Sequence, residues 1–184
     1  MNPPPILPRI AGALERLAIP YMLSGSFASS HHGAPRTTQD IDIVVNPSLA
    51  QLDELLTALE GPDVYLDRDV AHEELARRGQ FNVIEMSSGW KVDVIFAKRR
   101  AFSRTELERR VRATILGTDL FVASPEDAIL SKLEWAKLGG SDRQLADVSG
   151  IVKTQGTSLD RAYVEEWLDD LGVRGLWLRV LAAL

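Results

Sequence analysis

The sequence predicts an α/β core followed by a helical C-terminal region. Short runs of apolar and β-branched residues alternate with segments of helical periodicity up to about residue 120, and only helical patterns recur after Ser124. Apolar residues make up 45 % of the chain, near the average for globular proteins, so we expect a well-formed core. We therefore expect a core domain over residues 1–120 and a helical region packed on it over residues 121–184.

The first elements are delimited by proline and glycine. Apolar residues from Ile6 to Leu17 recur at helical spacing and stop before Pro20. A short apolar strand over residues 21–24 then ends at Gly25-Ser26, and FASSHH predicts a short helix closed by Gly33.

The DIDIVV segment over residues 40–45 predicts a strand, because β-branched residues dominate it. Ser48 is expected to cap the next helix, whose leucines lie on one face as far as Leu59. Further elements are expected at 68–79 (a charged helix or loop), 81–86 and 90–96 (a hairpin), 103–111 (a basic helix), and 112–116 and 119–122 (short strands).

The C-terminal region should begin with a capped helix. Ser124 is placed as the N-cap, Pro125 at the first helical position, and Glu126 and Asp127 in the first turn, and Gly139-Gly140 ends the helix. Further helices are expected over 142–154, 158–171 and 173–183.

Composition excludes several classes of protein. The formal net charge of -5 argues against a non-specific nucleic-acid coat, which needs a basic surface. The absence of cysteine excludes disulfides and thiolate metal sites and fits a reducing compartment. The first residues do not resemble a signal peptide, and no apolar run approaches the ~18 residues of a membrane helix. We expect a soluble cytoplasmic protein.

Three aspartates form the candidate catalytic set. Asp40 and Asp42 share a face of their strand because side chains alternate with period two. Their mutual repulsion would be relieved by a divalent cation, and magnesium (or manganese) prefers such hard oxygen ligands. Asp93, in WKVDVIF, would complete the site if its strand lies beside DIDIVV. Metals held there would activate a hydroxyl and stabilise a leaving pyrophosphate, with Asp93 alternatively a general base.

Gly25-Ser26 is a candidate phosphate-binding turn. Glycine lets the backbone approach a phosphate closely, and the N–H groups of the following helix turn would face the anion. The alternative is a plain turn with a helix cap, followed by two surface aspartates on an edge strand.

With these motifs the sequence resembles the DNA-polymerase-β-like nucleotidyltransferase superfamily, which has a Gly-Ser or Gly-Gly turn, a D-x-D strand and a later single carboxylate. GSFASSHHGAPRTTQDIDIVV and KVDVIF match this pattern. The resemblance narrows towards the AbiEii-type branch, with R-x-T before D-x-D and C-terminal helices that carry a lysine and an Arg…Asp pair. The matching positions here are Arg36, Thr38, Lys132, Arg143 and Asp147. One departure is Ala146, where many relatives have a basic residue.

The resemblance implies a small mixed sheet flanked by helices, magnesium-dependent binding of a nucleoside triphosphate, and transfer of its nucleotidyl group to a hydroxyl acceptor. It implies metal ligation by the three aspartates and nucleotide contacts from Gly25, Ser26, Arg36, Thr38, Lys132 and Asp147. Some branch members are toxins of toxin–antitoxin pairs that modify RNA, notably tRNA ends. RNA, tRNA or protein acceptors and an antitoxin partner thus stay open, as does a non-catalytic module that binds nucleotide or a partner.

Several features have simpler alternatives. Lys132 would bind phosphate or be a solvated lysine on a helix flank, and Asp147 would orient Lys132, bind a ribose hydroxyl or be a surface charge. The basic stretch 98–112 would guide a polyanion or form a salt-bridged surface. His31 and His32 are expected to be structural or solvent-facing. Apolar residues of the last helices would pack within the chain or form a homodimer face.

Overall fold

The computed structural model describes residues 5–35 and 37–184. Arg36, a predicted nucleotide contact, lies outside the described residues. The elements are α1 (Ile6–Arg16), β1 (Tyr21–Leu23), α2 (Gly25–His32), β2 (Asp40–Val45), α3 (Leu49–Leu59), β3 (Val64–Tyr65), α4 (Arg68–Arg77), β4 (Gln80–Glu85), β5 (Trp90–Phe96), α5 (Ala101–Arg109), β6 (Val111–Ile115), β7 (Thr118–Val122), α6 (Pro125–Gly139), α7 (Asp142–Gln155), η1 (Gly156–Ser158), α8 (Arg161–Leu171) and α9 (Arg174–Ala182).

The chain divides into two compact units. Unit 1 comprises Met1–Leu23 and Thr38–Val122, and unit 2 comprises Ser24–Thr37 and Ala123–Leu184. The boundary between Val122 and Ala123 lies close to the expected domain boundary at residue 120. The segment that contains α2, which we expected within the core domain, groups instead with the C-terminal helices.

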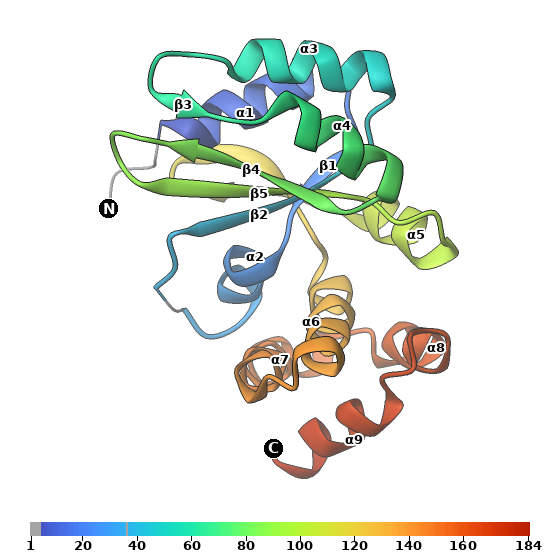
Figure 1. Ribbon diagram of the computed structural model, residues 1–184. Helices are drawn as coiled ribbons and strands as arrows, with labels where there is room; N and C mark the ends of the chain where they lie inside the picture. The colour runs from blue at the N-terminus through green and yellow to red at the C-terminus, as the bar shows by residue number, and fades with distance from the viewer. Residues whose placement is uncertain (1–4, 36) are drawn as a thin grey trace. The chain divides into compact units, whose positions relative to one another are not determined.

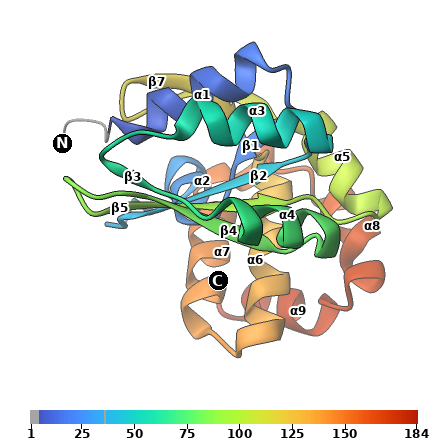
Figure 2. The same ribbon diagram turned by 45° about the horizontal axis from the view of Figure 1, so that its top comes forward.

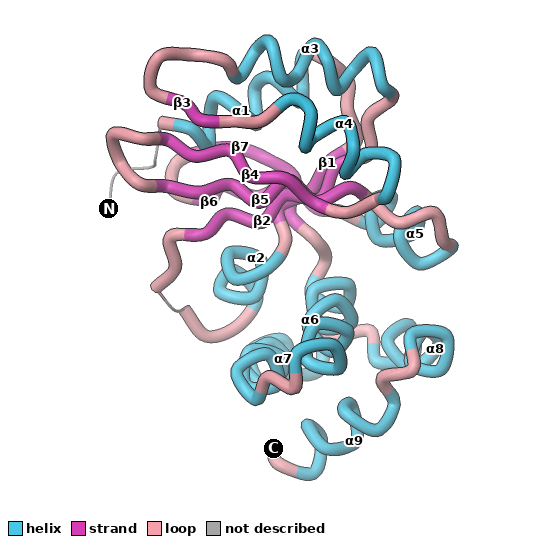
Figure 3. Tube along the Cα trace, in the orientation of Figure 1, coloured by secondary structure: helices cyan, strands magenta, loops and turns pink. Residues whose placement is uncertain are grey.

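Unit 1 contains a seven-stranded mixed sheet in the order β3-β4-β5-β2-β1-β7-β6. Its strands are magenta in Figure 3. β2 runs parallel to β5 and β1 runs parallel to β7, whereas the other neighbouring strands are antiparallel. The predicted α/β class and mixed sheet are therefore confirmed. β3 was not predicted, because a strand of two residues is too short to show a periodic pattern.

One face of this sheet forms the core of unit 1. Alternate residues of β2 and β5 are buried on it, and α1, α3 and α4 cover it (Figures 1 and 2). Ser48 begins α3 as predicted, in a capping box: its hydroxyl accepts from the Gln51 N–H at 3.2 Å, and the Gln51 side chain accepts from the Ser48 N–H at 2.9 Å. The leucines at 52, 55, 56 and 59 of α3 are fully buried, so its apolar face is the predicted one.

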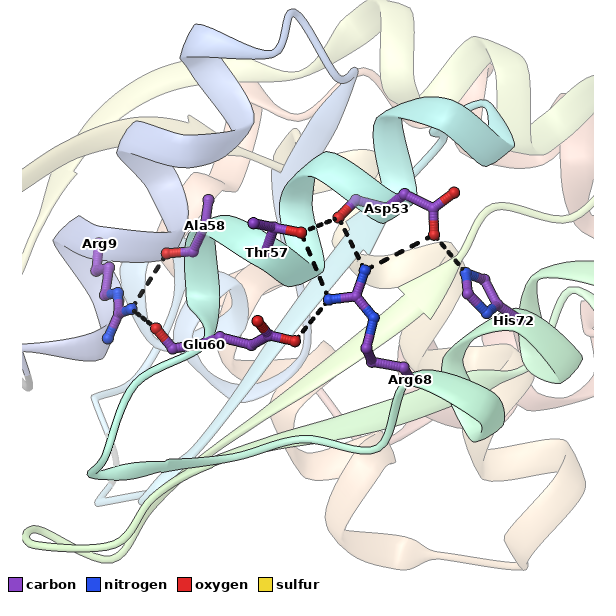
Figure 4. A network of polar contacts seen from close by, with 7 residues as sticks. All are labelled: Arg9, Asp53, Thr57, Ala58, Glu60, Arg68 and His72. Atoms are coloured by element: carbon purple, nitrogen blue, oxygen red, sulfur yellow. Dashed lines mark hydrogen bonds and ion pairs between the residues drawn. The ribbon is translucent and has the colours of Figure 1, made fainter.

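A polar network joins the three covering helices (Figure 4). Arg9 of α1 donates to two carbonyls at the end of α3, and Arg68 of α4 donates to the Glu60 carboxylate at 2.6 Å. His72 of α4 contacts the Asp53 carboxylate of α3 at 2.7 Å. Exposed pairs of this kind contribute roughly 0–1 kcal/mol each, so the network chiefly orients the helices.

In unit 2, α6 begins as predicted, with the Ser124 hydroxyl accepting from the Asp127 N–H and Pro125 in the first turn. α8 begins three residues later than expected, at Arg161, because the Asp160 side chain caps it by accepting from the Tyr163 N–H. None of the helices formed by the described residues is both long and apolar enough to cross a membrane.

α2 approaches α7 closely at two glycines. A Cβ on Gly33 would lie 2.7 Å from the backbone nitrogen of Ile151, and one on Gly150 would lie 3.3 Å from that of Ala34. These distances involve backbone atoms, which cannot move aside as a flexible side chain can. The absence of side chains at both positions therefore permits this packing.

We predict that Gly33→Ala lowers the free energy of unfolding by about 1–3 kcal/mol, because the added methyl group overpacks a backbone contact. Gly139→Ala is the matched control, since no neighbouring atom lies within 4 Å of its Cβ position. Urea unfolding followed by circular dichroism measures both variants, and equal stabilities would contradict the tight approach.

Candidate active site

The predicted aspartates lie on two neighbouring parallel strands of unit 1. β2 and β5 pair with Asp40 opposite Lys91 and Asp42 opposite Asp93. Paired residues point to the same face of a sheet, so the three aspartates and Lys91 share one face. The condition under which Asp93 would complete the set, that the WKVDVIF strand lies beside DIDIVV, is therefore met.

The apolar residues of the two strands hold this alignment. Ile41 and Ile43 pair with Val92 and Val94 on the opposite face, and all four side chains are buried. Slipping the register of β2 by one residue would carry Ile41 and Ile43 out of the core and the carboxylates into it. The packing of the apolar face thus places Asp42 beside Asp93.

Lys91 connects two of the three carboxylates. Its Nζ lies 3.0 Å from Oδ2 of Asp93 and 3.6 Å from Oδ1 of Asp40. The hydrogen bond to Asp93 raises the pKa of Lys91 above its usual value, burial acts in the opposite direction, and the charges of Asp93 and Asp40 add to the rise. Lys91 is therefore an ammonium, and it partly neutralises the acidic face.

Asp93 is the most buried of these aspartates, with 8 % of its surface exposed. Its Oδ2 accepts the bond from Lys91, whereas its buried Oδ1 has no hydrogen-bond partner. An unsatisfied buried acceptor costs roughly 1–3 kcal/mol, so it is a natural position for a ligand with positive charge.

A divalent metal fits the chemistry of this face. Aspartate oxygens are the hard donors that Mg²⁺ and Mn²⁺ prefer, and Oδ1 of Asp93 has a coordination position to offer. No three His, Asp or Glu side chains within residues 5–35 and 37–184 are grouped closely enough to hold a metal. Metal ligation by Asp40, Asp42 and Asp93 stays a prediction.

The predicted Gly-Ser turn begins α2 in unit 2. Gly25 has a φ of 56°, a left-handed conformation that a residue with a Cβ adopts only with strain. Ser26 follows it in the first helical turn, where backbone N–H groups favour anions. The local geometry thus agrees with a turn that needs glycine, and phosphate binding there stays a prediction.

Thr38 has a structural partner within unit 1. Its hydroxyl accepts a hydrogen bond from the backbone N–H of Asp40 at 3.3 Å. This contact fixes the backbone just before the D-x-D strand. A nucleotide contact from Thr38 is still a prediction, and the geometry adds a role in positioning Asp40.

Lys132 and Asp147 form a buried ion pair in unit 2. Nζ of Lys132 lies 2.8 Å from Oδ2 of Asp147, and the two side chains are only 5 % and 10 % exposed. Ser29 of α2 also donates to Asp147, at 3.4 Å. The alternative that Lys132 is a solvated lysine is therefore wrong. The contact agrees with one of the suggested roles of Asp147, which is to orient Lys132. Arg143, by contrast, is exposed.

The histidines are placed as expected. His32 is buried, and its Nε2–H donates to the Ala123 carbonyl at 2.7 Å, whereas His31 is exposed. Burial lowers the pKa of His32, which favours the neutral ring. His32 therefore has a structural role in unit 2.

Part of the basic stretch is engaged within unit 1. The guanidinium groups of Arg110 and Arg112 lie 4.5 and 4.2 Å from the ring centroid of Phe121, and Arg112 pairs with Glu15 at 3.1 Å. These contacts favour the salt-bridged surface over a polyanion guide for these two arginines.

Two polar residues of the acidic face were not predicted as site residues. Lys91 lies two residues before Asp93 and therefore on the same face, but we predicted no role for it, because its pairing with Asp40 depends on the neighbouring strand. Asn82 of β4 is exposed and pairs with Asp93 across the other edge of β5. Only strand pairing could have identified Asn82.

Comparison with solved structures identifies the fold of this chain. A crystal structure of ANT(2'')-Ia in complex with adenylyl-2''-tobramycin aligns with a TM-score of 0.60 at 16 % identity, covering 92 % of this chain and 96 % of that one. The fold is that of the nucleotidyltransferases. A solution structure of the antibiotic-resistance factor ANT(2'')-Ia aligns with a TM-score of 0.54 at 15 % identity, covering 93 % and 91 %.

A third similar structure is an antigenic nucleotidyltransferase-like protein from Paracoccidioides brasiliensis, with a TM-score of 0.53, 20 % identity and coverage of 81 % and 73 %. These neighbours share the fold that the resemblance implies. The sequence matches no protein-family model, and no curated protein matches it in sequence. The narrower AbiEii-type assignment stays a prediction.

We predict that Lys132→Met lowers the free energy of unfolding by about 3 kcal/mol, because it leaves the Asp147 carboxylate without its ammonium partner. The double variant Lys132→Met/Asp147→Leu should lose much less than the sum of the two single losses, since it removes both buried charges. Chemical denaturation of all four proteins measures the coupling, and strictly additive losses would contradict a buried pair.

Proposed function

We propose that this chain is a nucleotidyltransferase that uses a divalent metal, magnesium or manganese, to move a nucleotidyl group from a nucleoside triphosphate to a hydroxyl acceptor. The observation that carries the proposal is the pairing of Asp42 with Asp93 on adjacent parallel strands, with the inner oxygen of Asp93 unsatisfied. The nucleotidyltransferase fold supports it independently.

Asp40, Asp42 and Asp93 would hold the metal, which when bound neutralises phosphate charge and makes the acceptor hydroxyl more acidic. In the transfer step the acceptor oxygen forms a bond to the α-phosphorus, and the bond from that phosphorus to the leaving pyrophosphate breaks. As the alternative to ligating the metal, Asp93 would accept the hydroxyl proton as a general base. The roles of these groups are positioning and charge stabilisation, as phosphoryl-group chemistry requires.

The phosphate contacts are assigned to unit 2. The left-handed backbone of Gly25 permits a close approach of phosphate oxygens to the first turn of α2, and Ser26 lies in that turn. Lys132, oriented by Asp147, supplies a point charge for the triphosphate. Arg36 and Thr38 complete the proposed nucleotide contacts.

Several classes of molecule are candidate acceptors of the nucleotidyl group. ANT(2'')-Ia is solved with an adenylylated tobramycin, so the fold accommodates a small polyhydroxyl acceptor in that protein. The sequence resemblance favours RNA, with tRNA ends foremost, or protein. Aminoglycosides, tRNA and a protein mixture therefore belong in one acceptor panel.

A second candidate function is a module that binds nucleotide or a partner without transfer. The observation that favours it is the Lys91 ammonium, which already pairs with Asp40 and Asp93. Calorimetry with each triphosphate separates the two candidates: tight binding without turnover on any acceptor supports the module.

We predict that Asp42→Asn lowers transfer by about 10²-fold or more, because it removes a charge from the metal-binding face. The assay uses triphosphates labelled at the α-phosphorus, with label at the γ-phosphorus as a control that must not transfer. Asp69→Asn, an exposed aspartate of α4, is the matched variant and should retain full activity. Equal labelling by the wild type and Asp42→Asn would exclude the proposed site.

A toxin role is a separate prediction. Expression of the wild type should arrest bacterial growth, whereas Asp40→Ala should not, and co-expression of a neighbouring antitoxin-like gene should restore growth. Growth curves after induction measure this. Harmless expression of a protein that transfers nucleotides in vitro would contradict the toxin role and leave the activity intact.

A further inference from the structure

Lys91 occupies an unusual place for a lysine. It lies on the same sheet face as the three aspartates, directly opposite Asp40 and two residues before Asp93 on β5. Its ammonium reaches both carboxylates, at 3.6 and 3.0 Å. A single positive charge is thus held where the proposed function requires a divalent cation.

We propose that Lys91 is a built-in counter-ion that holds Asp40 and Asp93 in the metal-free protein, is displaced from them by the divalent cation, and thereby sets the affinity of the site for metal. This inference rests on the proposed function, because it takes the aspartates as metal ligands.

The Lys91 ammonium acts in opposite ways on the carboxylates and on an incoming cation. Two carboxylates on one face repel each other, and the Lys91 ammonium offsets that repulsion when it bridges them. The same ammonium repels an incoming cation. A metal bound to either carboxylate oxygen that contacts Lys91 would lie within a few ångströms of its charge, so ligation there and the lysine contact exclude each other.

The two carboxylate oxygens of Asp93 have different environments. Oδ2 is committed to Lys91, whereas Oδ1 is buried without a hydrogen-bond partner. Oδ1 is therefore the oxygen of Asp93 that a cation can bind without competing with Lys91, once a turn of the carboxylate brings this buried atom to the surface. Recruitment of Oδ2 of Asp93 and of Oδ1 of Asp40 competes with Lys91, because its ammonium contacts both oxygens. The metal gains these two oxygens only when the lysine moves away.

The side chain of Lys91 suits displacement. It is about one-third exposed, and Asp40 is 60 % exposed, so neither the ammonium nor its outer partner is locked in the interior. A lysine head on a flexible four-carbon stem can move into solvent without disturbing the strand. This mobility distinguishes Lys91 from Lys132, whose side chain is only 5 % exposed.

The experiment measures Mn²⁺ binding to the full chain by electron paramagnetic resonance, without nucleotide, and thermal unfolding in EDTA and in Mn²⁺. Lys91→Met should bind Mn²⁺ roughly tenfold more tightly than the wild type, because the competing charge is gone. It should also unfold at lower temperature in EDTA and regain stability in Mn²⁺ more than the wild type does. Lys91→Arg should stay close to the wild type.

Lys98→Met is the matched control, because Lys98 is an exposed lysine of the same unit, outside the acidic face. It should change neither the Mn²⁺ affinity nor the melting temperature in EDTA. Equal or weaker Mn²⁺ binding by Lys91→Met, beside a wild type that binds, would overturn the counter-ion role.

A further variant separates this inference from the proposed function. Asp93→Asn should abolish Mn²⁺ binding if the aspartates are the ligands. Loss of binding in Asp93→Asn together with unchanged affinity in Lys91→Met would overturn only the role of Lys91. A wild type that binds no Mn²⁺, or an Asp93→Asn protein that binds as well as the wild type, would overturn both proposals.

Discussion

The parallel pairing of β2 with β5 is the constraint on which the candidate site depends. The two strands present opposite chemistries on their two faces, with β-branched side chains in the core and carboxylates on the other side. Burial of the apolar face selects the register, and the register then places Asp42 beside Asp93. The site therefore needs no separate folding determinant, since the packing that stabilises the sheet also aligns the acids.

Unit 2 holds the side chain of Lys132 in a nearly closed environment, where it is only 5 % exposed. A buried ammonium is tolerated only with a well-placed partner, and Asp147 supplies it at 2.8 Å with Ser29 as a further donor to the carboxylate. The three side chains come from α6, α7 and α2, and the close approach of α2 to α7 relies on the bare backbone at Gly33 and Gly150. Small residues and the ion pair are thus parts of one arrangement.

Local patterns predicted most of the fold, because alternation, capping and turn residues are readable within a few positions. DIDIVV was predicted at its observed bounds, and Ser48 and Ser124 were identified as caps for this reason. Non-local effects were predicted less well, and the contact of Lys132 with Asp147 was only one of several alternatives. Lys132 resembles a solvated lysine until α2 and α7 close over it, and the contact of Lys91 with Asp40 requires knowledge of which strand lies next to β5.

Charge balance links the acidic face to the order of binding that the proposed chemistry implies. Three aspartates and Lys91 leave a formal charge of −2, which a single divalent cation would neutralise. A second cation would then meet an uncharged site unless more negative charge arrives with it. A nucleoside triphosphate carries that charge. A second metal would therefore need to arrive together with the nucleotide, and the proposed displacement of Lys91 would make the carboxylates more receptive at that step.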